Sequence, residues 1–491
     1  MFVGNNFLRS LARRQAHRPP IRAAAALALL SCTALSSPAF AQYTWAGDVS
    51  GDWSVASNWA GLPLVYGPVT SLIFNAPGLG GSALHNPFGS ALHGPSDYLT
   101  ENALVFNADA NYVISGERIV LVNFGPHIVM NANHDIRITN DLQIAISAVV
   151  DLIVNGGGSG VLTLSGVISP RSPVGYGLRF QNPGPAPLAR IVLTGENTYL
   201  GPTTIGAGVQ LTVGSDNALG DPGGGTTVEG GGALLLTGGI ALQEQQITLP
   251  NNATLLNGAG NNTVLGAISV ASGTARIQSD AGTLTLAGPI TTASPPPATL
   301  SLGGAGDILV QGAVQGTLAV TVDGPGTTTL TAVNSYTGVT AIIGGTLALK
   351  GAGSIALSPV LVVDTGTLDI SATTAGAEIT SLSAGLLVGS GGVVNLGART
   401  LTLTDASETF RGVIQGSGGL SITGGTETLT GVNTYTGATT IAADAFLALG
   451  THPLGVVGSI AASSGVQVDG TLDISGTSGG ASIRSLSGTL S

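Results

Sequence analysis

A thirteen-residue pattern occurs three times in this sequence, and it restricts the possible folds more than any other feature. The pattern L-T-x-x-N-[TS]-Y-x-G-x-T-x-I occupies residues 193–205, 330–342 and 429–441. A second block also recurs, because the Gly-Thr-Leu-Asp-Ile-Ser of residues 366–371 returns at residues 470–475. Repetition on this scale predicts a solenoid, in which each unit buries its apolar face against its neighbours.

The stretches between these copies alternate between apolar and polar residues. Runs such as 161–164, 210–213 and 283–286 are apolar at every second position, which is typical of short β-strands. The 76 glycines follow no G-X-Y period, which excludes collagen, and aromatic residues make up only 4% of the chain. Small aliphatic side chains must therefore fill the core. We predict an all-β, elongated parallel β-helix with roughly 20–25 residues per coil, and a closed barrel or sandwich is the alternative.

The first 41 residues predict a helical secretory signal peptide. Five arginines lie within the first 22 residues and precede an apolar run over residues 23–30. Ala39 and Ala41 form a small-residue site that fits cleavage before Gln42. The segment ending at Cys32 loosely resembles a lipobox, so lipidation of this cysteine is the alternative. No later segment has the about 18 uninterrupted apolar residues of a membrane-spanning helix. We expect export from a bacterial cytoplasm by the Sec machinery.

Two regions follow the predicted signal peptide. Residues 42–150 are expected to form an N-terminal β region with an insertion loop over residues 80–100. Trp45, Trp53 and Trp59 are all the tryptophans of the chain, and we expect them to cap the first coil; a carbohydrate-stacking platform is the alternative. Residues 151–491 are expected to form the β-helix. Because Ser491 falls within the second copy of the recurring block, we expect the chain to be truncated at its C-terminus.

The thirteen-residue pattern resembles the autotransporter-associated β-strand repeat of type V secretion passenger domains. The segment from Tyr43 to Trp59 also resembles the opening of such passengers. The resemblance implies a right-handed parallel β-helix that an outer-membrane β-barrel translocator carries to the cell surface. We expect this barrel to be absent from the chain, because no set of alternating strands of about 10 residues ends in an aromatic residue.

Each copy of the motif supplies three residue types to which we assign structural roles. The asparagines are expected to hydrogen-bond backbone groups at a turn: Asn197, Asn334 and Asn433. The tyrosines are expected to cover the edge of the core with the hydroxyl facing outward: Tyr199, Tyr336 and Tyr435. The glycines are expected to let the next strand start sharply: Gly201, Gly338 and Gly437.

Candidate chemical sites are few. The segment 476–480 fits the nucleophile pattern G-x-S-x-G, but no histidine follows it in the sequence. His127 with His134 and Asp135 could build a site, although a surface turn is the preferred interpretation. Residues 303–307 resemble a calcium-binding nonapeptide but are one residue short. A single cysteine excludes disulfides and cysteine-based zinc sites. We predict no catalytic, cofactor-binding or metal-binding residues.

Charge and composition narrow the function further. The net charge of −11 becomes −16 once the five N-terminal arginines are removed (−11 − 5), and such a chain repels nucleic acids. We expect a non-enzymatic passenger, displayed at the surface or released, that acts in adhesion or cell–cell aggregation. Its partner would be a host surface, a carbohydrate or another copy of the chain. A β-helical polysaccharide-active enzyme and a non-functional truncated gene product are the alternatives.

Overall fold

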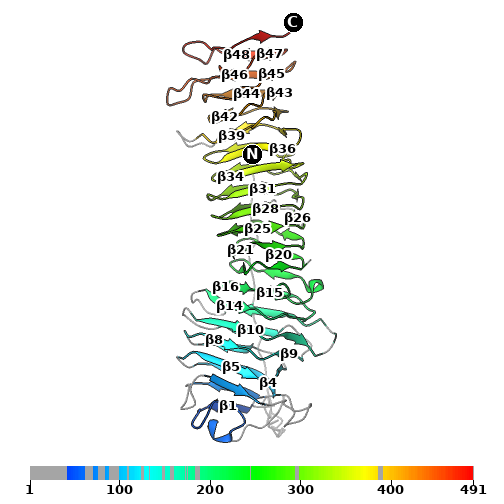
Figure 1. The fold of residues 1–491 in the computed structure, drawn as a ribbon, viewed down its shortest axis with the longest axis vertical. Helices are drawn as coiled ribbons and strands as arrows, with labels where there is room; N and C mark the ends of the chain where they lie inside the picture. The colour runs from blue at the N-terminus through cyan, green and yellow to red at the C-terminus, as the bar shows by residue number, and fades with distance from the viewer. Residues whose placement is uncertain are drawn as a thin grey trace, which may run out of the picture. The chain divides into compact units, whose positions relative to one another are not determined.

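The strands of this protein stack as successive coils along one axis (Figure 1). The computed structural model describes residues 41–60, 70–75, 83–87, 99–107, 110–122, 126–131, 133–145, 150–154, 160–171, 173, 175–182, 188–243, 245–292, 298–384 and 391–489. Residues 40–491 form one compact unit. The predicted signal peptide, with Cys32 and Ala39, lies outside the described residues.

Three long parallel sheets form most of the solenoid. The first contains β1 (Ala41–Trp45), β2 (Thr70–Phe74), β4 (Leu99–Phe106), β6 (Ile119–Leu121), β7 (Pro126–Met130), β9 (Leu142–Ile144), β10 (Val150–Val154), β12 (Ile168–Pro170), β13 (Leu178–Gln181), β15 (Thr203–Ile205), β17 (Thr226–Val228), β20 (Ile247–Leu249), β23 (Ile268–Val270) and β26 (Ile290–Thr292). The second contains β3 (Ala83–Asn86), β5 (Tyr112–Gly116), β8 (Ile136–Ile138), β11 (Val161–Leu164), β14 (Ala189–Leu193), β16 (Val209–Val213), β18 (Ala233–Thr237), β21 (Thr254–Ala259), β24 (Gly273–Ser279), β27 (Ala298–Gly303), β30 (Ala319–Asp323), β33 (Thr340–Ile342), β35 (Leu361–Val363) and β38 (Leu382–Ser383). The third contains β19 (Ala241–Leu242), β22 (Asn262–Val264), β25 (Thr283–Leu286), β28 (Asp307–Val310), β31 (Thr327–Leu330), β34 (Thr346–Gly351), β36 (Thr367–Thr373), β39 (Val393–Asn395) and β42 (Val413–Gln415).

Three smaller parallel sheets complete the described strands. The six-stranded sheet contains β37 (Ala377–Ile379), β40 (Leu401–Leu403), β43 (Leu420–Ile422), β45 (Thr439–Ile441), β47 (Val466–Val468) and β49 (Leu486–Ser487). The four-stranded sheet contains β41 (Thr409–Phe410), β44 (Thr426–Leu429), β46 (Phe446–Leu449) and β48 (Thr471–Asp473). The two-stranded sheet pairs β29 (Gln315–Gly316) with β32 (Ser335–Tyr336).

The alternation of the sequence explains how the coils stack. Along the second sheet, inward-facing aliphatic side chains lie in one unbroken register from strand to strand. From Ile191 to Val363, partners in this column are 20 to 25 residues apart, as in Ile191 to Leu211 and Ile277 to Leu302. These side chains are almost fully buried, so each coil gives the next an apolar surface to cover. The column consists of Ile136, Leu162, Ile191, Leu211, Leu234, Leu255, Ile277, Leu302, Val322, Ile342 and Val363. The prediction of an elongated parallel β-helix is confirmed.

Aromatic rings pack together with aliphatic side chains in the core of the first coils. Trp45 and Trp59 meet edge to face with ring centroids 5.0 Å apart, and Phe74 stacks on Phe106 at 4.9 Å. Trp45, Trp53 and Trp59 are at most 2% exposed. A carbohydrate-stacking platform needs an open ring face. The three tryptophans therefore do not form one.

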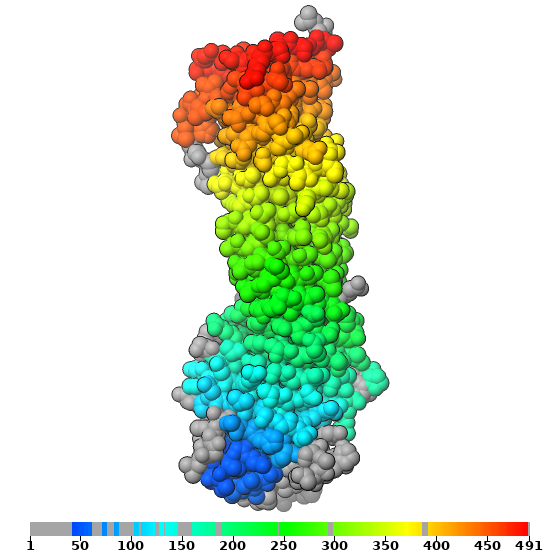
Figure 2. Space-filling view, in the orientation of Figure 1, coloured from blue at the N-terminus to red at the C-terminus, as the bar shows by residue number. Residues whose placement is uncertain are grey.

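Helical structure is limited among the described residues to two single 3₁₀ turns, η1 (Ala56–Asn58) and η2 (Pro222–Gly224). A helix of sufficient length and apolarity to cross a bilayer is not found in this part of the chain. In the space-filling view, the coils follow one another in chain order from blue to red (Figure 2).

Candidate functional site

The three copies of the repeat motif form corners of the solenoid, where the backbone leaves one sheet and enters the next. The first copy runs from the end of β14 to β15, the second from β31 through β32 to β33, and the third from β44 to β45. Each copy therefore starts and ends on a strand whose Leu or Ile side chain faces the core. The residues between them fix the geometry of the corner.

The motif asparagine connects three successive coils. The side-chain oxygen of Asn334 accepts a hydrogen bond from the Val314 backbone N–H of the preceding coil at 2.8 Å. Its side-chain nitrogen donates to the Ser354 carbonyl of the following coil at 2.9 Å. Asn197 and Asn433 make the same two kinds of contact, and all three side chains are at most 4% exposed. Buried backbone groups that no β-ladder pairs are satisfied in this way.

The motif tyrosine points into the core, and the prediction of an outward hydroxyl is wrong. Tyr199, Tyr336 and Tyr435 are at most 1% exposed. Each hydroxyl lies 2.6 to 2.7 Å from the hydroxyl of the threonine four residues later in the motif. A buried phenol hydroxyl needs a hydrogen-bond partner, and the threonine of the same motif provides it. The partners are Thr203, Thr340 and Thr439.

Sequence reasoning missed these threonines and the serines beyond them. The Thr340 hydroxyl donates to the Ser358 hydroxyl at 2.9 Å, and Ser358 donates back to the Gly338 carbonyl at 3.0 Å. In the third copy, Ser463 has the same role beside Thr439. The constant spacing from tyrosine to threonine was a usable signal. The serines follow their threonines by 18 and 24 residues, so no fixed spacing identifies them.

Burial of the motif tyrosines makes their ionisation a measure of folding. Burial raises the pKa of Tyr435 to about 12, although its hydrogen bond to Thr439 opposes the rise. The folded pKa of Tyr435 lies above its unfolded value. The stability that depends on keeping this buried phenol neutral is therefore complete below the unfolded pKa and is lost as pH rises through about 12. Burial also raises the pKa of Tyr112, Tyr199 and Tyr336, so we expect an ultraviolet titration of the folded chain to show several late-ionising tyrosines, and Tyr435→Phe to reduce this late phase by one residue. An unchanged late phase in this variant would contradict the assignment.

The motif glycines are required for a reason other than the predicted one. None of the three has a positive φ. A Cβ on Gly201, Gly338 or Gly437 would instead lie 2.2 to 2.3 Å from a backbone atom of the preceding coil. The glycine thus permits close contact between coils, and conformational freedom is not what the position demands.

The candidate chemical residues have ordinary structural environments. His127 is fully buried with its Nε2 atom 3.1 Å from the Val122 carbonyl, so the surface-turn interpretation is wrong for this histidine. The Asp135 carboxylate accepts a hydrogen bond from the Val161 N–H, and the Asp307 carboxylate accepts one from the Thr327 N–H of the next coil. Ser478 is exposed in a turn. Within the described ranges, no three His, Cys, Asp or Glu residues are grouped to hold a metal ion.

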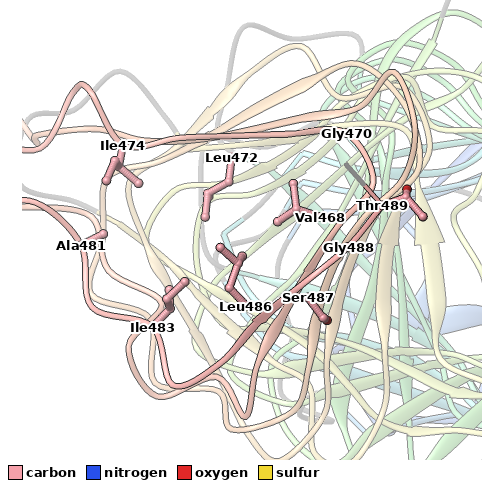
Figure 3. A pocket seen from close by; sticks show the side chains of 10 residues that line it. All are labelled: Val468, Gly470, Leu472, Ile474, Ala481, Ile483, Leu486, Ser487, Gly488 and Thr489. Atoms are coloured by element: carbon pink, nitrogen blue, oxygen red, sulfur yellow. The ribbon is translucent and has the colours of Figure 1, made fainter. Parts of the chain in front are cut away.

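One hollow lies where the apolar core reaches the last described strands. It measures about 640 Å³ and is lined by side chains that include Val468, Leu472 and Leu486 (Figure 3). Leu472 is in register with the buried Leu447 of the preceding coil, and Val468 is in register with Ile441. These are core-facing positions on the last described strands. We therefore assign no ligand to this hollow.

Hydroxyl-bearing residues form an in-register row on the side of the first sheet that faces away from the core; the four threonines are partly exposed, whereas the serine is buried at 7% exposure. One outward residue from each of five consecutive strands, β15, β17, β20, β23 and β26, lies in register with the next. Neighbouring strands in a sheet are about 4.8 Å apart, so the hydroxyls repeat at that spacing. This hydroxyl row consists of Thr204, Thr227, Thr248, Ser269 and Thr291.

A second polar area lies on the outer face of the third sheet. A shallow hollow of about 590 Å³ there is lined by threonines of β25 and β31 and by Leu309 of β28, and also by Asp307, Gln311 and Lys350. Lys350 is the single lysine of the chain. Small polar side chains therefore face outward on this sheet too, but Leu309 lies in register between Thr285 and Thr329 and interrupts them.

The predicted cleavage residues coincide with the start of β1. Ala41 is the first residue of this strand and pairs with Thr70, and Gln42 pairs with Ser71. Cleavage before Gln42 would remove only the first residue of the strand. Whether cleavage occurs there stays a prediction.

The structure is a parallel β-solenoid whose corners carry a recurring Asn-Tyr-Gly motif. A family model described as the passenger-associated-transport-repeat matches residues 190–209, 320–349 and 415–443. These ranges contain all three copies of the motif. The chain therefore carries three passenger-associated-transport repeats, and over these ranges it is similar to autotransporter passengers.

One curated relative is itself named an autotransporter. The chain is 32% identical over 238 residues to a protein named adhesin BmaC autotransporter from Brucella suis biovar 1. The match covers 46% of this chain but 6% of that protein, so the chain corresponds to a small part of its length. No solved structure matches the chain.

Proposed function

We propose that this chain is an autotransporter passenger that is exported to the cell surface or the extracellular space and acts there in adhesion, through the hydroxyl row on its first sheet. The hydroxyl row carries the proposal. Each hydroxyl contributes a weak hydrogen bond, but a rigid row at constant spacing engages several groups of one polymer or surface at once. The printed name of the relative, an adhesin, supports the same class of function.

The proposed partners follow from the fold and the repeats. Export would use the Sec machinery and an outer-membrane translocator, as autotransporter passengers in general do. The adhesive partner would be rich in hydroxyl or amide groups, such as a carbohydrate or a second copy of the chain. The contact surface is non-enzymatic in this proposal.

Removal of the hydroxyl row tests the proposal. Replacing Thr204, Thr227, Thr248 and Thr291 with valine and Ser269 with alanine removes five hydroxyls, of which the four on threonine are partly exposed. The valines keep strand-forming side chains at those four positions. We expect roughly a tenfold loss of attachment of chain-coated beads to glycan surfaces or to one another. The matched control replaces Thr263, Thr285 and Thr329 with valine, because Leu309 interrupts that row.

Circular dichroism would show that both variants keep their β structure. Attachment at the wild-type level by the five-residue variant would contradict the proposal. Cleavage of a polysaccharide by the wild-type chain would favour the enzymatic alternative.

A further inference from the structure

A carboxyl group lies in the core of the solenoid at the third copy of the motif. In β44, residues 426–429 alternate outward and inward, and Glu427 occupies an inward position two residues before Leu429. Its side chain is fully buried. The next coil places the buried Leu447 in register with it. Glutamate is almost never fully buried without a partner, so this position requires a physical explanation.

The other two copies provide an internal comparison. The inward position two residues before the motif leucine is Ile191 in the first copy and Thr328 in the second, and both are buried. An aliphatic or a small hydroxyl side chain therefore suffices for folding at this corner. The glutamate is particular to the third copy.

The described residues in register with Glu427 on the two adjacent coils carry no positive charge. The pairing of Thr409 with Thr428 places Glu408 beside Glu427 on the preceding coil. Leu382 of β38 offers its backbone N–H, and the β46 strand after it contributes Phe446, Leu447, Ala448 and Leu449, which carry no charge. Among the described residues, Glu408 is the one charged group that acts on Glu427. Two carboxylates in adjacent coils repel each other.

Burial therefore raises the pKa of Glu427 well above its usual range, and the negative charge of Glu408 raises it further. The Leu382 N–H opposes this rise in part. The folded pKa exceeds the unfolded value, so the chain takes up a proton when this coil folds. The resulting stability is fully present below the unfolded pKa and is lost as pH rises through the folded pKa.

We propose that Glu427 and Glu408 form a proton-operated switch that loosens the coils of β41, β44 and β46 when the surroundings become less acidic. The switch lies next to the third corner, where Asn433 connects three coils. Opening there would disorder the outward row of Thr402, Ser421 and Thr440 on the six-stranded sheet. This inference does not depend on the proposed adhesive function, because it follows from the core alone.

Hydrogen exchange of the whole chain tests the switch. Protection of β44 and β46, corrected for intrinsic exchange, is expected to fall at least about tenfold between about pH 5 and about pH 8. The equivalent strands of the second copy, β31 and β34, should stay unchanged and serve as the internal control. Glu427→Gln, which carries no charge at either pH, should remove the dependence.

A second variant keeps the test decisive if Glu427→Gln folds poorly. Glu408→Gln removes the repelling charge from a half-buried position, so the loss of protection should become smaller while β44 stays ordered. A wild-type chain without this pH dependence would overturn the proposal. The same dependence in Glu427→Gln would also overturn it.

Discussion

Replacing Asn334 with leucine is expected to open the second motif corner, at a cost of about 3–5 kcal/mol in local stability. The variant removes the partners of the Val314 N–H and of the Ala332 and Ser354 carbonyls, which Asn334 contacts at 2.8 to 3.1 Å. Each buried backbone group left without a partner costs roughly 1–3 kcal/mol. Leucine has nearly the same size, so the effect reports hydrogen bonding and not lost volume.

The measurement must be local because repeat proteins unfold in segments. Stability in a solenoid is approximately a sum over coils and their interfaces, so a single global midpoint averages over regions that the mutation does not touch. Hydrogen exchange in β29, β31, β32 and β33 should report the loss, and exchange in β14 and β16 should not change. Ser335→Ala, on the exposed side of the same corner, is the control and should resemble the wild type.

Asn334→Asp separates the acceptor role of the side chain from its donor role. The carboxylate still accepts from the Val314 N–H, but it faces the Ala332 and Ser354 carbonyls without a proton to donate. Protonation restores one donor, so this variant should gain stability as pH falls, unlike the leucine variant. Equal stability of wild type, leucine and aspartate variants would show that the corner does not depend on the asparagine.

The fold could be predicted because every coil repeats the same alternation of inward apolar and outward polar residues. Leu211 and Leu234 face inward while Gln210 and Thr212 face outward, and this alternation determines which face is buried. The twenty-odd residues between partners then set the coil length. Neither feature requires knowledge of any particular contact.

The interior of the corners could not be predicted in the same way. The sequence shows that Tyr336 precedes a glycine, but the direction of its hydroxyl depends on Thr340 and on Ser358 in the next coil. From the sequence alone, Glu427 is indistinguishable from an ordinary surface acid. The strand register places it between Glu408 and Leu447. Because the loops between coils vary in length, no fixed spacing in the sequence identifies such partners.

The second large effect is expected from Gly338→Ala. A Cβ at this position would lie 2.2 Å from the Leu318 carbonyl oxygen and 2.5 Å from the Ala319 nitrogen, so the backbone of one coil must move. That movement strains the hydrogen bond from the Gly338 N–H to the Leu318 carbonyl, now 3.0 Å. Overpacking together with one weakened hydrogen bond should cost about 2–4 kcal/mol.

Gly479→Ala is the matched control, because nothing lies within 4 Å of its Cβ position and its φ is not positive. Hydrogen exchange should show loss of protection in β30 and β33 for Gly338→Ala and none for Gly479→Ala. The Ser358 hydroxyl donates to the Gly338 carbonyl, so the displacement should also reach the hydrogen-bonded chain from Tyr336 through Thr340. If Gly338→Ala kept wild-type protection in β33, the close contact between these two coils would not be what requires glycine in the motif.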